Sequence, residues 1–194
     1  MEKITERQKE IIDVAGKLLT ESGIGGLTIK NIAREMQFSE SAVYRHFQSK
    51  EEIVLLMLEY LALNMNERLG GLKTMEKDPP EKLLAIFENQ LRFFSKNKQY
   101  VVAVFSDGLM EQSESINERI LAIMQVKMRH LFPVVFEGQK KGFFTDEVKC
   151  EELIHIIIGA FRLQMFKWRA MGFDYDIKKS GMESVRALLK VIAK

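Results

Sequence analysis

The stretch "SESAVYRHFQSKEEI", residues 39–53, places two helix starts within about a dozen residues. Ser39 and Ser49 are candidate N-caps, because a serine hydroxyl can accept a hydrogen bond from an amide in the first turn of a helix. The first of the two helices is too short to be stable by itself, so it needs a surface to pack on. Val43 and Phe47 lie four residues apart and predict that one face of this short helix enters a core while the other face stays polar.

Two further helices precede this stretch. One apolar stripe follows Thr5, a candidate N-cap, and a second stripe follows Thr28, which can cap the next helix. The glycine-rich run 23–26 separates them, because glycine readily adopts the left-handed conformation at a helix C-terminus. Residues 37–39 leave only a tight turn before the third helix. The stripes comprise Ile11, Ile12, Ala15, Leu18 and Leu19, and then Ile29, Ile32, Ala33 and Met36. This spacing predicts a helix-turn-helix unit around a small three-helix core.

Helical spacing continues to the C-terminus, and no stretch alternates apolar and polar residues over the length of a strand. Asp78 and Pro79 mark a helix start, since a first helical residue needs no amide hydrogen. Pro133 should kink or interrupt a later helix. The expected helices of the body lie near 80–96, 98–111, 114–141, 148–171 and 177–193. The sequence therefore predicts an all-α chain of about nine helices, with a three-helix helix-turn-helix domain at 1–50, a connecting helix at 49–70, and a C-terminal helical bundle body at 51–194.

The composition is that of an ordinary globular protein, with 46% hydrophobic and 29% charged residues and a net charge of only +2. Any DNA contact must therefore depend on where groups are placed rather than on bulk charge. Within 28–50, the charged residues are Lys30, Arg34, Arg45 and Lys50 against Glu35 and Glu40. The single cysteine, Cys150, excludes an intrachain disulfide and fits a reducing compartment. No apolar run has the length of a signal-peptide core or a membrane span, so we expect a cytoplasmic protein without membrane contact.

The outward face of the short third helix combines small residues with hydrogen-bonding ones. Glu40, Tyr44 and Gln48 share one side by helical spacing, with Ser41 and Arg45 beside them. A helix whose first turn is polar and open fits a DNA major groove, where each base pair presents a distinct set of donors and acceptors. Rings at helical spacing are also common in ordinary cores, and short helix-turn-helix patterns arise by chance. Spacing alone therefore leaves DNA binding and simple packing open.

The residues "GLTIKNIAREMQFSESAVYRHFQSKEEI", 26–53, closely resemble the DNA-binding signature of the TetR family of transcriptional regulators, and "LLTESGIGGLT" ends the helix before them. This resemblance implies a homodimer that reads a palindromic operator in double-stranded DNA and acts as a repressor. Glu40 is an awkward member of the reading set, because a carboxylate can accept from a cytosine amino group but repels phosphate. The DNA-binding residues that the resemblance implies are Thr28, Lys30, Ser39, Glu40, Ser41, Ala42, Tyr44, Arg45, His46 and Lys50.

The segment 152–173 is apolar almost all round, which predicts burial on more than one side. In a chain of 194 residues, that burial comes either from a deep core or from a second subunit. The family resemblance implies dimerisation through the last two long helices, in a four-helix bundle. The predicted dimer-interface residues are Ile157, Gly159, Ala160, Trp168, Val185, Leu188, Leu189 and Ile192.

A set of phenylalanine and methionine residues lies between the connecting helix and that interface. Such residues line adaptable apolar pockets, and they also make ordinary cores, so the residues alone leave both readings open. The family resemblance favours a pocket for a mostly apolar small molecule, whose binding would shift the helix at 49–70 and change the separation of the two DNA-reading heads. The predicted effector-binding residues are Phe87, Leu91, Phe94, Phe105, Met124, Met128, Phe132 and Phe166.

Two other classes of function stay open. The first is a DNA-binding regulator without a small ligand, which acts as an activator or under the control of a protein partner. The second is a small all-α enzyme. Against the enzyme, the three histidines at 46, 130 and 155 are scattered, and the glycine-rich run 23–26 follows a helix and lacks the lysine ending of a phosphate loop. We therefore expect no catalytic residue, no metal and no cofactor.

Overall fold

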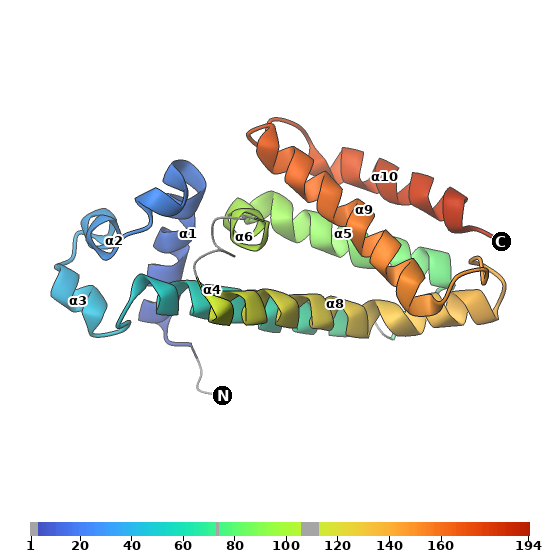
Figure 1. Ribbon diagram of the computed structural model, residues 1–194, viewed down its shortest axis with the longest axis horizontal. Coiled ribbons are helices and arrows are strands. Elements are labelled where there is room, and N and C mark those ends of the chain that lie inside the picture. Colours follow the sequence, from blue (N-terminus) through green and yellow to red (C-terminus); the bar gives the residue numbers. More distant parts are fainter. Residues whose placement is uncertain (1–3, 73, 106–112) are drawn as a thin grey trace. The chain divides into compact units, whose positions relative to one another are not determined.

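The computed structural model describes residues 4–72, 74–105 and 113–194. Over these residues the chain is helical, and its only β-type pairing is one bridge between Phe144 and Ala193, which confirms the all-α fold class. None of the described helices is both long enough and apolar enough to cross a membrane. In chain order the helices are α1 (Glu6–Gly26), α2 (Ile29–Met36), α3 (Glu40–Tyr44), α4 (Lys50–Gly70), α5 (Pro79–Lys96), α6 (Lys98–Val104), α8 (Glu114–Lys140), α9 (Cys150–Ala170) and α10 (Ile177–Ile192) (Figure 1).

The described chain forms two compact units. The first lies within Met1–Ala62 and Lys98–Ile123, and the second lies within Leu63–Asn97 and Met124–Lys194. Both α4 and α8 begin in the first unit and end in the second. The first unit is thus larger than the predicted helix-turn-helix domain, because α6 and the first parts of α4 and α8 pack with the N-terminal helices.

Helix caps fix the N-terminal helices where the sequence predicts them. Thr5 and Gln8 form a capping box at the start of α1, in which the Thr5 hydroxyl accepts from the Gln8 amide at 3.2 Å. Gly23 has a φ of 63° and breaks the helical geometry near the end of α1. Thr28 caps α2 by accepting from the Asn31 amide at 3.1 Å. The apolar stripes of α1 and α2 are largely buried, so the two helices pack into one small core.

The start of α4 carries the Ser49 cap that the sequence predicts, together with a second hydrogen bond just before it. The Ser49 hydroxyl accepts from the Glu52 amide at 3.2 Å, and the Glu52 carboxylate accepts from the Gln48 amide at 2.6 Å. Elsewhere in the first unit, α6 approaches α1 closely at Gly16, where a Cβ atom would lie 2.7 Å from the Gln99 side chain. A residue larger than glycine would therefore push these two helices apart.

In the second unit, α10 packs along α5 and contacts α9 (Figure 1). Asp78 caps α5 and Pro79 is its first residue, as predicted. The centre of this unit is aromatic: the Phe161 ring of α9 lies 5.2 Å from the Phe87 ring and 6.3 Å from the Phe94 ring of α5, centroid to centroid. Aromatic pairs at these separations stabilise a core beyond the area that they bury.

Two of the predicted helices of the body, at 114–141 and 98–111, correspond to α8 and α6. The helix predicted at 114–141 is observed as α8, which runs through Pro133 without interruption. Proline removes one backbone hydrogen bond, but Leu131 and Val135 beside it are both 0% exposed, and their burial holds the helix on the core. The helix predicted at 98–111 is described only over Lys98–Val104, and its last part lies outside the described residues.

Candidate nucleic-acid interface and body cleft

Two buried side chains hold α3 in place, and a serine caps it. The Ser39 hydroxyl accepts from the Ala42 amide at 3.2 Å and lies 2.8 Å from the Ser41 hydroxyl. Val43 and Phe47 are 0% and 1% exposed, which confirms the predicted core face. Because a helix of five residues does not stabilise itself, this core contact fixes the direction in which its outer face points.

The outer sides of α2 and α3 are open to solvent. Nine of the ten predicted DNA-binding residues are exposed, and the tenth, Ala42, is half-buried. Tyr44 is 51% exposed, so its ring does not belong to the core. Gln37 adopts the left-handed conformation with a φ of 57° and ends α2, which lets the chain turn into α3 within three residues. The two packed helices therefore present the predicted reading residues on a surface.

The charges around this surface favour an anionic partner. Lys17 of α1 donates to Glu35 of α2, and this hydrogen bond raises the pKa of the lysine and lowers the pKa of the carboxyl. The acidic group of α2 is thereby paired with a cation. Arg45 and Lys50 form no ion pair with any described residue, so both are available to phosphates. Glu40 is equally unpaired among the described residues and stays exposed at the start of α3.

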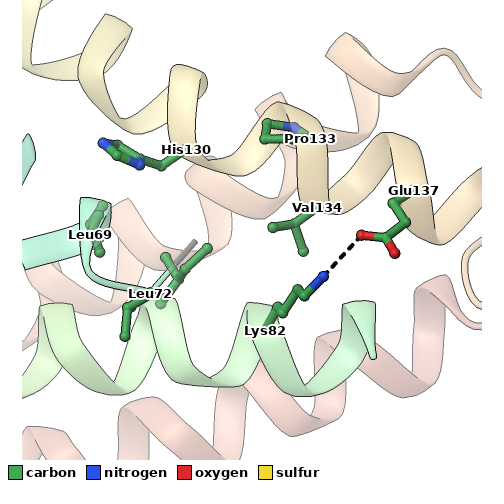
Figure 2. A pocket seen from close by; sticks show the side chains of 8 residues that line it. Leu69, Leu72, Lys82, His130, Pro133, Val134 and Glu137 are labelled. Carbon is green, nitrogen blue, oxygen red and sulfur yellow. Dashed lines mark hydrogen bonds and ion pairs between the residues drawn. The ribbon is translucent and has the colours of Figure 1, made fainter. Parts of the chain in front are cut away.

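The second unit contains a cleft of about 320 Å³ between α5, α8 and the end of α4 (Figure 2). At one end of it, Lys82 of α5 donates to Glu137 of α8 at 3.1 Å. Hydrogen bonds from Lys141 and then Lys82 lower the pKa of the Glu137 carboxyl. Elsewhere along the cleft, the His130 imidazole is hydrogen-bonded to an α4 side chain. The cleft is lined by Leu69, Leu72, Lys82, Ile86, His130, Pro133, Val134 and Glu137.

None of the predicted effector-binding residues lines this cleft. Phe87, Leu91 and Phe94 are buried in the core of the second unit, and Met124 and Met128 are half-buried. Phe132 and Phe166 are 38% and 50% exposed, and half-buried Phe105 belongs to the first unit. The structure therefore brings Phe87 and Phe94 together around the Phe161 ring but does not gather the whole set. The physical reason is that apolar residues cover more than one face of α8 and α9, so spacing does not say which of them points inward.

The polar residues of the cleft were not predicted from the sequence. Lys82 and Glu137 are 55 positions apart, and each stands among other charged residues on its own helix, which resembles a solvated face. In the sequence, His130 stands far from the other two histidines and shows no metal-site or catalytic spacing. A hydrophobic pattern carries no signal for a polar contact between two distant helices, so only the folded chain reveals this one.

The predicted dimer-interface residues divide into two groups. Ile157, Trp168, Val185 and Ile192 are buried in the core of their own chain, and the Trp168 indole donates to the Tyr175 carbonyl oxygen at 2.9 Å. These four side chains are therefore already covered and do not form an outer surface. Leu188 and Leu189 are half-buried, whereas Gly159 and Ala160 are exposed. The exposed face of α9 instead consists of Ile156, Gly159, Ala160, Leu163 and Phe166, and Leu163 is 65% exposed.

Two sequence profiles match the chain and together cover most of it. The profile described as bacterial regulatory proteins, tetR family, matches residues 11–57, and the profile described as YsiA-like protein, C-terminal region, matches residues 60–191. The chain belongs to the TetR family. The resemblance found in the N-terminal residues is thus confirmed and extends through the body. As a TetR-family protein, the chain is a DNA-binding transcriptional regulator.

Curated relatives share part of the sequence. The HTH-type transcriptional regulator YuxN of Bacillus subtilis (strain 168) is 27% identical over 149 residues, which are 74% of this chain and 50% of YuxN. The nucleoid occlusion factor SlmA of Shewanella sediminis is 26% identical over 167 residues, which are 84% of each protein. The chain thus spans half the length of the first relative and most of the length of the second.

Solved structures share the fold over nearly the whole chain. The transcriptional regulator FadR from Bacillus subtilis, in complex with stearoyl-CoA, matches with a TM-score of 0.82 at 18% identity, over 95% of this chain and 98% of FadR. A transcriptional regulator from Saccharomonospora viridis, in complex with choline, matches with a TM-score of 0.82 at 20% identity, over 97% of this chain and 98% of that one. At these identities the likeness shows the fold alone.

Proposed function

We propose that this TetR-family regulator is a cytoplasmic homodimeric repressor that binds a palindromic operator and is released from it by a small-molecule effector. The observation that carries the proposal is the outer face of α3, which is exposed around Tyr44 while Val43 and Phe47 anchor the helix from below. A rigidly held short helix with an open polar face suits base reading in a major groove. Two-fold symmetry then pairs the two heads with the two half-sites of a palindrome.

The dimer proposal is supported by the exposed stripe on α9. Ile156, Leu163 and Phe166 are 53%, 65% and 50% exposed, and they follow helical spacing with Gly159 and Ala160 between them. A Cβ atom added at Gly159 would have no described atom within 4 Å, so the centre of the stripe is flat and open. Exposed apolar side chains grouped in this way mark an interaction surface. A second copy of α9 would bury them across a two-fold axis.

The effector proposal is supported by the cleft of the second unit and by the continuity of two helices. Both α4 and α8 line this cleft and both begin in the first unit, so a ligand that moves them acts on the unit that holds α3. Such a ligand causes the protein to release DNA only if it binds more tightly to the conformation of the protein that fits the operator poorly. The bound stearoyl-CoA and choline of the two similar structures show that this fold accepts ligands of very different chemistry.

A regulator without a small ligand is the second candidate. The likeness to SlmA supports it only in that this relative is named for nucleoid occlusion and not for a response to a small molecule. In this case, control would come from a protein partner rather than from an effector in the body.

The test of the proposal is a selection from a random pool of duplex DNA at near-physiological salt, since salt sets how much non-specific binding survives. We expect the protein to enrich an inverted repeat. Tyr44→Ala and Lys50→Ala should lose this enrichment, whereas Lys96→Ala, which changes an exposed lysine of the second unit, should keep it. Failure to enrich any sequence, before and after refolding to strip a bound ligand, would contradict operator binding. Enrichment of a single asymmetric site would contradict the symmetric dimer.

A further inference from the structure

A lysine is buried in the second unit without a counter-ion. Lys127 of α8 is 8% exposed, and its Nζ atom lies 4.0 Å from the centroid of the Phe161 ring. This Nζ forms no hydrogen bond or ion pair with any described residue. Burial lowers the pKa of Lys127 to about 7, since apolar surroundings disfavour the charged form. A cation–π contact offsets only part of the cost of removing an ammonium group from water.

A glutamine on α5 is in a similar position. Gln90 is 0% exposed, and neither its Nε2 nor its Oε1 atom finds a hydrogen-bond partner among the described residues. Buried amides in folded proteins are almost always hydrogen-bonded, because an unsatisfied one is destabilising. A leucine of similar size would fill the same space without this penalty. The glutamine is therefore poorly explained as a core residue.

Lys127 and Gln90 are both associated with the aromatic centre of the second unit. The Phe161 ring contacts the rings of Phe87 and Phe94 on α5. Gln90 stands about one turn after the first of these phenylalanines and one turn before the second, so it lies on nearly the same face of α5. Lys127 covers the Phe161 ring from α8. We call Lys127 and Gln90 the polar pair, because the ammonium lies on the Phe161 ring and the glutamine stands between the two phenylalanines of α5 that contact this ring.

The polar pair lies further along the same two helices that form the cleft. Lys82 of α5 pairs with Glu137 of α8, as Figure 2 shows. One turn later on α5, Ile86 lines the cleft together with Val134, which is about one turn earlier on α8. The two helices thus run in opposite directions, and their next turns lead from the cleft to the polar pair. The cleft is thus followed along α5 and α8 by the polar pair, which lies among the aromatic side chains of the second unit.

We propose that the polar pair binds the carboxylate of a monoanionic organic acid whose apolar body lies among the aromatic side chains and along the cleft. This inference rests on the proposed function and deepens it, because it gives the effector a chemical class. The Lys127 ammonium supplies the opposite charge, and the Gln90 amide donates to the second carboxylate oxygen. The pair holds one cation, which matches one negative charge, whereas a phosphate dianion would need further cations or an arginine fork. The class is therefore an alkyl or aryl monocarboxylic acid.

Binding at the polar pair also has a mechanical consequence. The pair is closely packed in the structure, so a ligand that reaches it must part α5 from α8. Because α8 begins in the first unit, which also holds α3, a movement of α8 would also act on the unit that is proposed to bind DNA. The proposed release from DNA requires such a movement. The same group thus recognises the ligand and starts the conformational change.

The experiment is a thermal-shift titration of the full-length protein at pH 6.5. The probes are a series of straight-chain acids from butanoate to dodecanoate and 4-phenylbutyrate, each beside its neutral alcohol. At a concentration of a hundred times its Kd, at least one acid should raise the melting temperature of the protein by about 5–10 °C. The corresponding alcohol should leave the melting temperature unchanged. Lys127→Met should abolish this rise and Gln90→Leu should weaken acid binding by about tenfold or more. Lys140→Met, an exposed lysine of the same helix, should respond like the wild type.

Three results would overturn the inference. The first is that no acid of the series stabilises the wild-type protein. The second is that an acid and its alcohol stabilise it equally, which would mean that the carboxylate is not recognised. The third is that Lys127→Met keeps the response to the acid. The affinity of each variant for the selected operator is measured in parallel, so that a failure of the proposed function appears separately, as a loss of DNA binding without any acid present.

Discussion

Replacing Lys127 by methionine should stabilise the protein, and the gain should depend on pH. The two side chains have similar length, so the change removes a buried charge without leaving a cavity. On folding, the pKa of Lys127 falls from 10.5 to about 7, which is about 3.5 pKa units at about 1.36 kcal/mol each. At pH 7 and below, the charged lysine therefore lowers the free energy of unfolding by about 4–5 kcal/mol.

The sign of the pH dependence follows from where the proton is bound. Between pH 7 and 10.5 the unfolded chain binds the lysine proton and the folded chain does not, so the wild-type stability rises with pH across this window. The destabilisation of the folded protein by Lys127 falls to about 2 kcal/mol at pH 9, and it vanishes above the pKa of this lysine in the unfolded chain. The difference between Lys127→Met and the wild type isolates this contribution, because the other titrating groups are common to both proteins.

The assay is urea unfolding followed by circular dichroism, at one protein concentration and at pH 6.5, 8 and 9.5. We expect the variant to be more stable at every pH, with the difference largest at pH 6.5 and smaller by more than half at pH 9.5. Lys140→Met serves as the control and should change stability by less than about 0.5 kcal/mol. Equal stability of Lys127→Met and the wild type at pH 6.5, or a difference that does not shrink with pH, would refute the reasoning.

Three further predictions concern the two units. Phe47→Ala should lower the free energy of unfolding by about 3–5 kcal/mol, because it removes a side chain that is 1% exposed, and a stability unchanged in urea titration would show that α3 is held differently. The double change Leu163→Glu and Phe166→Glu should convert the dimer into a monomer, as measured by light scattering, because it places charges on the exposed stripe of α9. The helical circular dichroism signal should stay the same. A dimer that persists would place the interface elsewhere. Gly23→Ala should cost about 1–2 kcal/mol in the same urea titration, because its φ of 63° strains any residue with a Cβ, and a stabilising effect would show that this conformation is not required.

The N-terminal elements could be predicted from the sequence in some detail. Thr5, Thr28, Ser39 and Asp78 all act as N-caps as expected, because capping depends on a few neighbouring residues. The buried face of α3 could be predicted equally well, because Val43 lies one helical turn from another apolar residue while most residues around it in the sequence are polar. Local chemistry of this kind can be read without knowing the rest of the fold.

The body was harder to predict, for two physical reasons. On α9, apolar residues surround the helix, so spacing could not tell that Trp168 is buried in its own chain while Phe166 is 50% exposed. The polar pair gives no pattern at all, because a lysine or a glutamine on a helix is normally solvated. At Pro133, α8 is not interrupted, and buried residues on both sides of the proline hold the helix on the core.

Reading of DNA by the outer face of α3 is tested most directly by fluorescence anisotropy with the selected operator, a scrambled duplex of equal length, and two salt concentrations. We predict that the wild type binds the operator about a thousandfold or more tightly than the scrambled duplex. Lys50→Met should weaken operator binding, because each subunit of a dimer loses one phosphate contact. The slope of the logarithm of the binding constant against the logarithm of the salt concentration should then fall by about two released ions. Lys96→Met should change neither the affinity nor this slope. Equal affinity for the two duplexes, or an unchanged salt dependence in Lys50→Met, would contradict the assignment of this face to DNA.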